Sequence, residues 1–148
     1  MIVTFFGHRD FIASEELRKR FMSILDEAVG DRSVEFFLGG YGGFDSFAHA
    51  CCRDFAEKHQ NSSLVFVTPY ITESYQKNHL EYMAGDFDSI IYPELEKIPK
   101  RYAISHRNRY MAEKADLIIC YVKRKFGGAY QAVSFAKSRG KKIINLAV

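Results

Sequence analysis

The feature that most constrains the fold of this sequence is a regular alternation of short apolar runs with amphipathic segments. The apolar runs lie at 2–6, 34–38, 63–70, 89–92, 116–122 and 142–148, and the helical segments lie at 14–29, 45–59, 104–114 and 127–140. Strands that are buried on both faces read as near-continuous apolar runs. Strands that alternate with helices indicate a parallel sheet covered on both sides. The sequence therefore predicts an α/β fold, a Rossmann-like three-layer sandwich with a mostly parallel central sheet.

The helical segment at 14–29 has the clearest local signals. Its apolar residues recur at helical spacing, and Ser14 before them is a typical N-cap. Gly30 follows the segment and is a typical helix stop. We therefore expect one amphipathic helix with both ends set by the sequence.

Length and composition limit the organisation of the chain. With 148 residues, it is expected to form one nucleotide-binding domain over 1–148. The N-terminal run is too short for a signal peptide, and no run approaches the ~20 apolar residues that span a bilayer. The three cysteines have neither the even number nor the spacing of a disulfide framework or a zinc site, so we expect buried thiols in a cytoplasmic protein without membrane partners.

Charge is unevenly distributed along the chain. Residues 1–96 hold eight Lys and Arg against sixteen Asp and Glu, whereas residues 97–142 hold thirteen against two. Such an asymmetry is typical of an electropositive face for nucleic acid or a phosphorylated ligand. The alternative is that folding mixes the two halves into an ordinary surface.

Three loops with unusual chemistry follow predicted strands, at 7–10, 39–45 and 123–129. Because the carboxyl ends of parallel strands meet at one edge of a sheet, these loops are expected to converge there. The first of them supplies Gly7, His8 and Arg9. We take His8 as an acid, a base or, more commonly for a loop histidine, a hydrogen-bonding group.

The loop at 39–45 reads GGYGGFD and contributes Gly39, Gly40, Gly43 and Asp45 as candidate ligand-binding residues. It matches neither the dinucleotide-binding pattern nor the P-loop pattern. Asp45 lies in the first helical turn, where a carboxylate repels a phosphate, so it is expected to cap the helix or to accept from ribose hydroxyls.

The loop at 123–129 is the better phosphate site. Gly127, Gly128 and Ala129 open a helix, basic residues precede them, and no acidic residue follows in the first turn. Arg107 and Asn108 near the start of an earlier helix complete the candidate ligand-binding set, because a guanidinium suits a phosphate or a carboxylate. The histidines lack metal-ligand spacing, and we expect no metal and no cofactor.

These segments, in the order VTFFGHRD, GGYGGFDSFAHA, RNRYMAEKADLIICYV and FGGAYQAVSFAKSRGKKIINLAV, resemble the SLOG superfamily. That superfamily joins DNA-processing proteins of the Smf type to Lonely-guy proteins, and the chain is most similar to its small YpsA-like members. The resemblance implies a Rossmann-like sheet that binds a nucleotide or nucleotide-derived ligand. Against the DNA-processing pattern SGGARGIDAAAH, the chain keeps the following residues: Gly39, Gly40, Gly43, Asp45, Ala48 and His49.

Lonely-guy enzymes cleave the N-glycosidic bond of a nucleoside monophosphate with an arginine and the glutamate of PGGxGTxxE. Arg107 matches that arginine by its spacing to Asp116, but Ser134 stands at the glutamate position. A neutral serine cannot stabilise an oxocarbenium-like state. The resemblance therefore leaves enzymatic activity disfavoured, with Asp45 and Arg107 as the candidate catalytic residues.

The sequence thus supports three functions. The first is a cytoplasmic binding module or sensor for a nucleotide-derived small molecule, with phosphate held at Gly127 and Gly128. The second is a hydrolase of N-glycosidic bonds. The third is a nucleic-acid-binding or protein-interaction role, which the basic 97–142 segment motivates and which we rank last because no aromatic and basic binding motif accompanies that charge. Homo-oligomerisation stays open.

Overall fold

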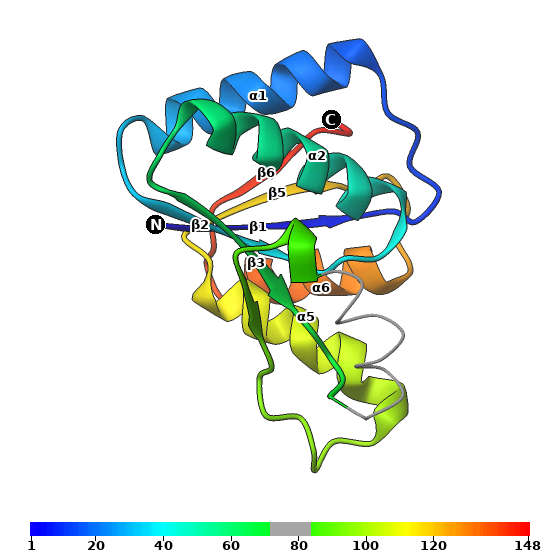
Figure 1. Cartoon of the computed structure of the whole chain (residues 1–148). Helices are drawn as coiled ribbons and strands as arrows, with labels where there is room; N and C mark the ends of the chain where they lie inside the picture. The colour runs from blue at the N-terminus through cyan, green and yellow to red at the C-terminus, as the bar shows by residue number, and fades with distance from the viewer. Residues whose placement is uncertain (72–83) are drawn as a thin grey trace.

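The computed structural model describes residues 1–71 and 84–148 and contains a six-stranded sheet with every strand pair parallel. The strand order is β4-β3-β2-β1-β5-β6 (Figure 1). The strands are β1 (Ile2–Gly7), β2 (Val34–Leu38), β3 (Ser62–Val67), β4 (Ser89–Ile91), β5 (Leu117–Tyr121) and β6 (Ile143–Asn145). Each one lies in an apolar run of the sequence.

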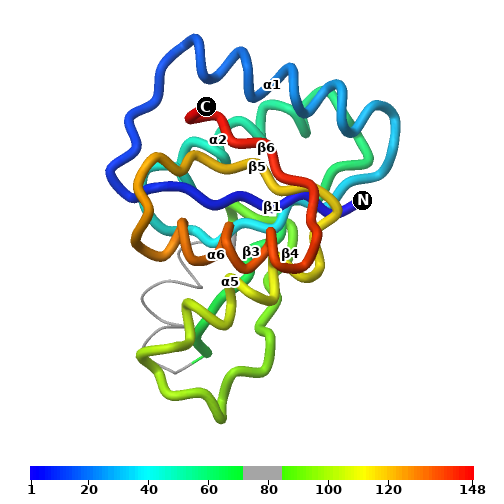
Figure 2. The backbone as a smooth tube through the Cα atoms, turned by 180° about the vertical axis from the view of Figure 1, so that it is seen from behind, coloured from blue at the N-terminus to red at the C-terminus, as the bar shows by residue number. Residues whose placement is uncertain are grey.

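Helices cover both faces of this sheet. The α-helices of the described residues are α1 (Glu15–Val29), α2 (Gly42–Lys58), α5 (Ala103–Lys114) and α6 (Gly128–Ser138), and short 3-10 turns lie at η2 (Ala84–Asp86) and η3 (Lys100–Tyr102). Helices α1 and α2 lie on one side, and α5 and α6 lie on the other (Figures 1 and 2). The predicted Rossmann-like three-layer fold is therefore confirmed.

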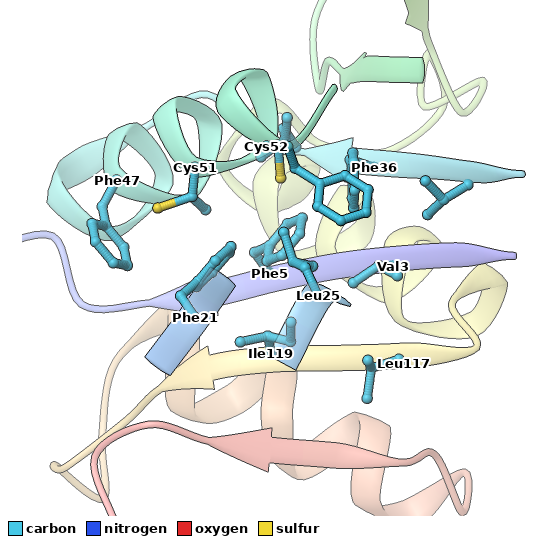
Figure 3. Packing of buried hydrophobic residues seen from close by; sticks show 14 of the residues in the cluster. Val3, Phe5, Phe21, Leu25, Phe36, Phe47, Cys51, Cys52, Leu117 and Ile119 are labelled. Atoms are coloured by element: carbon cyan, nitrogen blue, oxygen red, sulfur yellow. The ribbon is translucent and has the colours of Figure 1, made fainter. Parts of the chain in front are cut away.

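The face under α1 and α2 holds the larger apolar core. Val3 and Phe5 of β1 point to this face, and the Phe5 ring stacks on Phe21 of α1 at 5.5 Å between centroids. Cys51 and Cys52 of α2 are buried in the same layer (Figure 3). Burial raises the pKa of the Cys51 thiol to about 11, so these cysteines serve as small core residues.

The opposite face packs against α5 and α6. Residues that alternate with the first set point here, including Phe6 of β1 and Ile118 of β5, which meet Met111 of α5 and Val133 of α6. Alternation of side chains along a strand explains why adjacent apolar residues enter different cores. No helix among the described residues has the length and apolar character needed to cross a membrane.

Helix α1 begins and ends where its sequence signals indicate. The Ser14 hydroxyl accepts a hydrogen bond from the Leu17 N–H at 3.2 Å. Gly30 closes the helix at φ +56° and donates its N–H to the Asp26 carbonyl. By contrast, α2 begins at Gly42, three residues before the start predicted near residue 45, so Gly42 and Gly43 belong to its first turn.

Strand order reverses between β1 and β5, because the chain steps from β1 to β2, β3 and β4 on one side and reaches β5 and β6 on the other. In open parallel sheets, ligand sites form outside the carboxyl ends of the strands at such a switch point. The loops at 7–10 and 123–129 leave β1 and β5, the two strands that flank it. The fold therefore brings the candidate residues to the expected edge.

Candidate functional site

A cleft of about 450 Å³ opens at the carboxyl ends of the central strands. Its walls come from the ends of β1, the start of α2, helix α5 and the start of α6. The lining residues are Phe5, Phe6, Gly7, His8, Arg9, Tyr41, Asp45, Tyr70, Ile104, Arg107, Asn108, Met111, Arg124, Phe126, Gly127, Gly128 and Ala129. Three segments that are far apart in sequence, at 7–9, 41–45 and 124–129, thus share one cavity.

Nine of the twelve sequence-predicted ligand-binding residues line this cleft, and the exceptions are Gly39, Gly40 and Gly43. Sequence reasoning missed the aromatic residues Tyr41 and Phe126, although each adjoins a glycine that it selected. Tyr70 was also missed, because it follows β3 without any glycine or basic motif. An apolar and aromatic wall is typical of small-molecule sites, and no sequence motif predicted this wall.

Gly7 and Gly43 are required by packing at the start of α2. A Cβ atom on Gly7 would lie 2.2 Å from Cγ of Phe44, and a Cβ atom on Gly43 would lie 2.5 Å from the carbonyl oxygen of Phe11. The Gly43 N–H donates to the Arg9 carbonyl at 2.8 Å. These glycines therefore let the first turn of α2 lie directly against the loop after β1.

Asp45 lies partly buried in the cleft wall. Its Oδ2 accepts a hydrogen bond from the Tyr41 N–H at 2.9 Å, so the carboxylate caps the start of α2 as one of the two expected roles. Burial raises the pKa of Asp45 to about 6, and the Tyr41 N–H and the Arg107 charge lower it only in part. The cleft thus holds a carboxyl group that titrates near neutral pH.

Arg107 is 3% exposed and fixes the strand ends around the cleft. Its Nη1 donates to the carbonyl of Gly39, at 2.9 Å, and to that of Val67, at 2.8 Å. Its Nε donates to Oδ1 of Asn108 at 3.0 Å. Because Gly39 follows β2 and Val67 ends β3, Arg107 ties α5 to both strands. The prediction that it also contacts a ligand phosphate stays a prediction.

His8 connects the loop after β1 to the loop after β5. Its Nε2 accepts from the backbone N–H of Lys123 at 2.8 Å and from that of Arg124 at 3.3 Å. Burial lowers the pKa of His8, and the charges of Arg124 and Lys123 lower it further, while Asp10 opposes them. The hydrogen-bonding role expected for a loop histidine is therefore present, with a neutral ring whose Nε2 is the acceptor.

Arginines surround the mouth of the cleft. Arg124 forms a two-point ion pair with Asp10, with both N–O distances at 2.9 Å, and its guanidinium lies 5.6 Å from the Phe126 ring. The side chain of Arg9 is exposed and has no hydrogen-bond or ion-pair partner among residues 1–71 and 84–148. Of the described residues that line the cleft, only Asp45 is acidic. The balance of charge therefore favours an anionic ligand.

The start of α6 is open to the cleft. Gly127 adopts φ +93°, and a Cβ atom on Gly127 or Gly128 would meet no atom within 4 Å. Helix α6 has no side-chain cap and no acidic residue in its first turn. In the described part of the chain, no acceptor bonds the N–H groups of Gly128, Ala129 and Tyr130. The N-terminus of a helix with such unpaired N–H groups is the kind of position that favours an anion.

Ser134, at the position of the Lonely-guy glutamate, is exposed on α6 and does not line the cleft. The described residues contain no cluster of three or more His, Cys, Asp or Glu side chains that could hold a metal ion.

Comparison with known proteins identifies structural neighbours at low sequence identity. No protein-family model and no curated protein sequence matches the chain. It is similar to DNA processing protein A from Helicobacter pylori, whose structure describes a single-stranded DNA binding mode, with a TM-score of 0.63 and 16% identity over 98% of this chain and 64% of that one. It is also similar to the structural-genomics target TM1055, with a TM-score of 0.56 and 15% identity over 96% of this chain and 71% of that one.

At these identities, the similarity establishes a fold and not a shared activity. The chain spans less than two thirds of the Helicobacter pylori protein. Both neighbours share the Rossmann-like α/β fold that the resemblance of the sequence implied. The function must therefore be inferred from the cleft itself.

Proposed function

We propose that this chain is a cytoplasmic binding module or sensor for a nucleotide or nucleotide-derived small molecule, built as a single domain over 1–148 and similar to the small YpsA-like members of the SLOG superfamily. The ligand phosphate lies at the N-terminus of α6, against Gly127, Gly128 and Ala129. The sugar and base extend toward Asp45 and the aromatic wall at Tyr41.

The observation that carries this proposal is the open start of α6. Its N–H groups have no acceptor among the described residues. A Cβ atom on Gly127 or Gly128 would lie more than 4 Å from every described residue other than its chain neighbours and the backbone of α6. A helix N-terminus with free N–H groups and no acidic residue nearby favours an anion. The adjoining cleft is large enough for a ligand of nucleotide size.

The proposal is tested by calorimetric titration with adenosine, 5′-AMP and the other nucleoside monophosphates. We expect 5′-AMP to bind more tightly than adenosine, because only the nucleotide carries the phosphate. Gly128→Asp places a carboxylate at the anion site without a steric clash, and should weaken binding of the nucleotide at least about ten-fold. Ser134→Asp adds the same charge on an exposed face of α6 and should leave affinity unchanged. Equal affinity for adenosine and 5′-AMP would contradict the phosphate assignment.

A second candidate function is hydrolysis of an N-glycosidic bond, and the carboxyl group of Asp45 is the observation that favours it. Its pKa of about 6 suits a group that exchanges protons near neutral pH. Arg107 would position the phosphate or hold the surrounding loops, as it does through Gly39 and Val67. Release of free base from nucleoside monophosphates, lost in Asp45→Asn, would support this activity, whereas full activity of Asp45→Asn would remove Asp45 from it.

Nucleic-acid binding is the remaining alternative. It is favoured by a structural neighbour that binds single-stranded DNA and by the arginines around the cleft. This function predicts affinity for a single-stranded oligonucleotide that falls steeply as salt rises, because phosphate contacts release counterions. Absence of such binding at low salt would exclude it.

A further inference from the structure

A groove of about 340 Å³ continues from the cleft between α5 and α6. Ile104, Asn108 and Gly128 line both cavities, so the groove begins at the same helix start that forms the anion site. The residues that line the groove are Arg101, Ile104, Ser105, Asn108, Arg109, Gly128, Gln131, Ala132 and Phe135. A ligand whose phosphate rests at Gly128 thus has two directions open to it, one into the cleft and one along the groove.

The groove is electropositive. Arg101 and Arg109 lie in its walls, and none of the described residues that line it is acidic. Neither arginine has a carboxylate partner in the described part of the chain; each guanidinium instead lies over an aromatic ring, Arg101 at 4.8 Å from Tyr102 and Arg109 at 5.4 Å from Phe135. Cations held on ring faces keep their N–H groups available to an anion.

The nearest acidic side chain on α5 is already paired. Glu113 lies one helical turn after Arg109 and forms an ion pair with Arg139 at 3.6 Å. The Arg139 guanidinium also lies 5.1 Å from the centroid of the Phe135 ring. The charge of Glu113 is therefore offset by Arg139, and the pair leaves Arg109 as an uncompensated cation facing a groove.

We infer that the α5–α6 groove is a second phosphate subsite, with Arg101 and Arg109 as its ligands. The inference rests on the proposed function, since the first phosphate defines where the groove begins. A second phosphate subsite changes the expected ligand from a mononucleotide to a phosphodiester-linked dinucleotide. In such a dinucleotide, two phosphate groups are joined through a nucleoside. Asn108 lies between the two subsites and borders both.

The chemistry of the groove suits a phosphodiester. Guanidinium groups bind phosphate oxygens through parallel N–H donors. The amide side chains of Asn108 and Gln131 add hydrogen-bond donors and acceptors to the same groove.

Calorimetric titration of the full chain with 5′-AMP, with the 5′-phosphorylated dinucleotide pApA and with a single-stranded dT20 oligonucleotide tests this subsite. We expect the wild-type chain to bind pApA more tightly than 5′-AMP. Arg109→Gln should weaken pApA binding about five-fold, and the double variant with Arg101→Gln about ten-fold or more, with 5′-AMP affinity unchanged. Lys114→Gln is the matched control, because Lys114 is also a cation over a ring of α5, at 5.8 Å from Tyr110, and lines neither cavity.

The outcomes separate the subsite from the proposed function. If 5′-AMP binds but pApA binds no better, or if the arginine variants weaken both ligands equally, the second subsite is wrong and the first stands. If neither 5′-AMP nor pApA binds, the proposed function is wrong, and the second subsite, which rests on it, is wrong as well. If dT20 binds more tightly than pApA and its binding is weakened by the Arg101 and Arg109 substitutions, the second subsite is supported. The phosphodiester that it binds then belongs to single-stranded nucleic acid.

Discussion

The two glycine loops of this molecule look alike in sequence and play different parts. At the start of α2, Gly43 lies against the backbone of the loop after β1, and Asp45 caps the turn. At the start of α6, Gly127 and Gly128 lie beside open space, with no cap and no acidic residue. The first loop uses the missing Cβ atoms to pack protein on protein, whereas the second leaves room beside backbone donors.

This difference shows why a glycine-rich strand-to-helix turn does not by itself identify a ligand site. Both loops follow β-strands, and both start helices at the same edge of the sheet. Only the surroundings of each missing side chain distinguish them. Substitutions that add a Cβ atom to one glycine of each loop therefore test whether the two loops differ in this way.

The largest effect is expected for Gly43→Ala. The new Cβ atom would lie 2.5 Å from the Phe11 carbonyl and 2.8 Å from the Arg9 carbonyl, which are backbone atoms that cannot swing away. We expect a loss of about 3 kcal/mol in the free energy of unfolding, in the upper range for overpacking. Urea denaturation followed by circular dichroism measures it, and a loss below about 1 kcal/mol would show that the loop relaxes.

The next effect concerns the carboxyl group of Asp45. Its pKa is about 6 when folded and lies near 3.8 when unfolded, so the folded state binds the proton more tightly. The carboxyl group of Asp45 therefore contributes to the free energy of unfolding at low pH. This contribution decreases as pH rises from about 4 to about 6. Asp45→Asn removes the titration and retains an acceptor for the Tyr41 N–H.

We expect Asp45→Asn to gain stability relative to the wild type as pH rises from 4 to 7, by about 2 kcal/mol. Unfolding free energies of both proteins at several pH values give this difference, in which the titration of all other groups cancels. Asp54→Asn is the control, because its carboxylate pairs with Arg18 on α1, away from the cleft. A difference that does not change with pH would contradict the raised pKa of Asp45.

Sequence reasoning located the strands, α1 and the cleft because each depends on local pattern or on the geometry of parallel sheets. It selected Gly127, Gly128 and Ala129 by chemistry that reads directly from adjacent residues. It could not show that Gly43 lies outside the cleft, because that depends on how the loop after β1 packs on α2. The Arg107 bonds to Gly39 and Val67 likewise join residues that are distant in sequence.

A smaller effect is expected for His8, which holds the loop before α6. Burial and the charges of Arg124 and Lys123 lower its pKa in the folded state, and protonation would remove the acceptor of the Lys123 N–H. The stability that the neutral ring contributes is thus present above pH 6.5 and is lost as pH falls below it. His8→Gln keeps an acceptor oxygen near the Nε2 position and does not titrate.

Relative to His8→Gln, the wild type should therefore lose stability between pH 7 and pH 5, by under about 1 kcal/mol, the scale of one hydrogen bond. Thermal unfolding of both proteins across this range measures the difference. The groups that face the His8 ring are Asp10, Tyr121, Lys123 and Arg124, and only Asp10 favours its protonated form. An equal pH dependence of the two proteins would remove His8 as the titrating group.

The smallest effect is expected for Gly128→Ala, and its sign is opposite to that of Gly43→Ala. No atom lies within 4 Å of the new Cβ position, and Gly128 is the first residue of α6 with no left-handed backbone requirement. Alanine lowers the conformational entropy of the unfolded chain, so we expect a gain of about 0.5 kcal/mol. Gly127→Ala in the same loop should lose about 1 kcal/mol, because φ is +93° there. If Gly128→Ala destabilised the chain as Gly43→Ala does, the start of α6 would be filled by protein, and the distinction between the two loops would not hold.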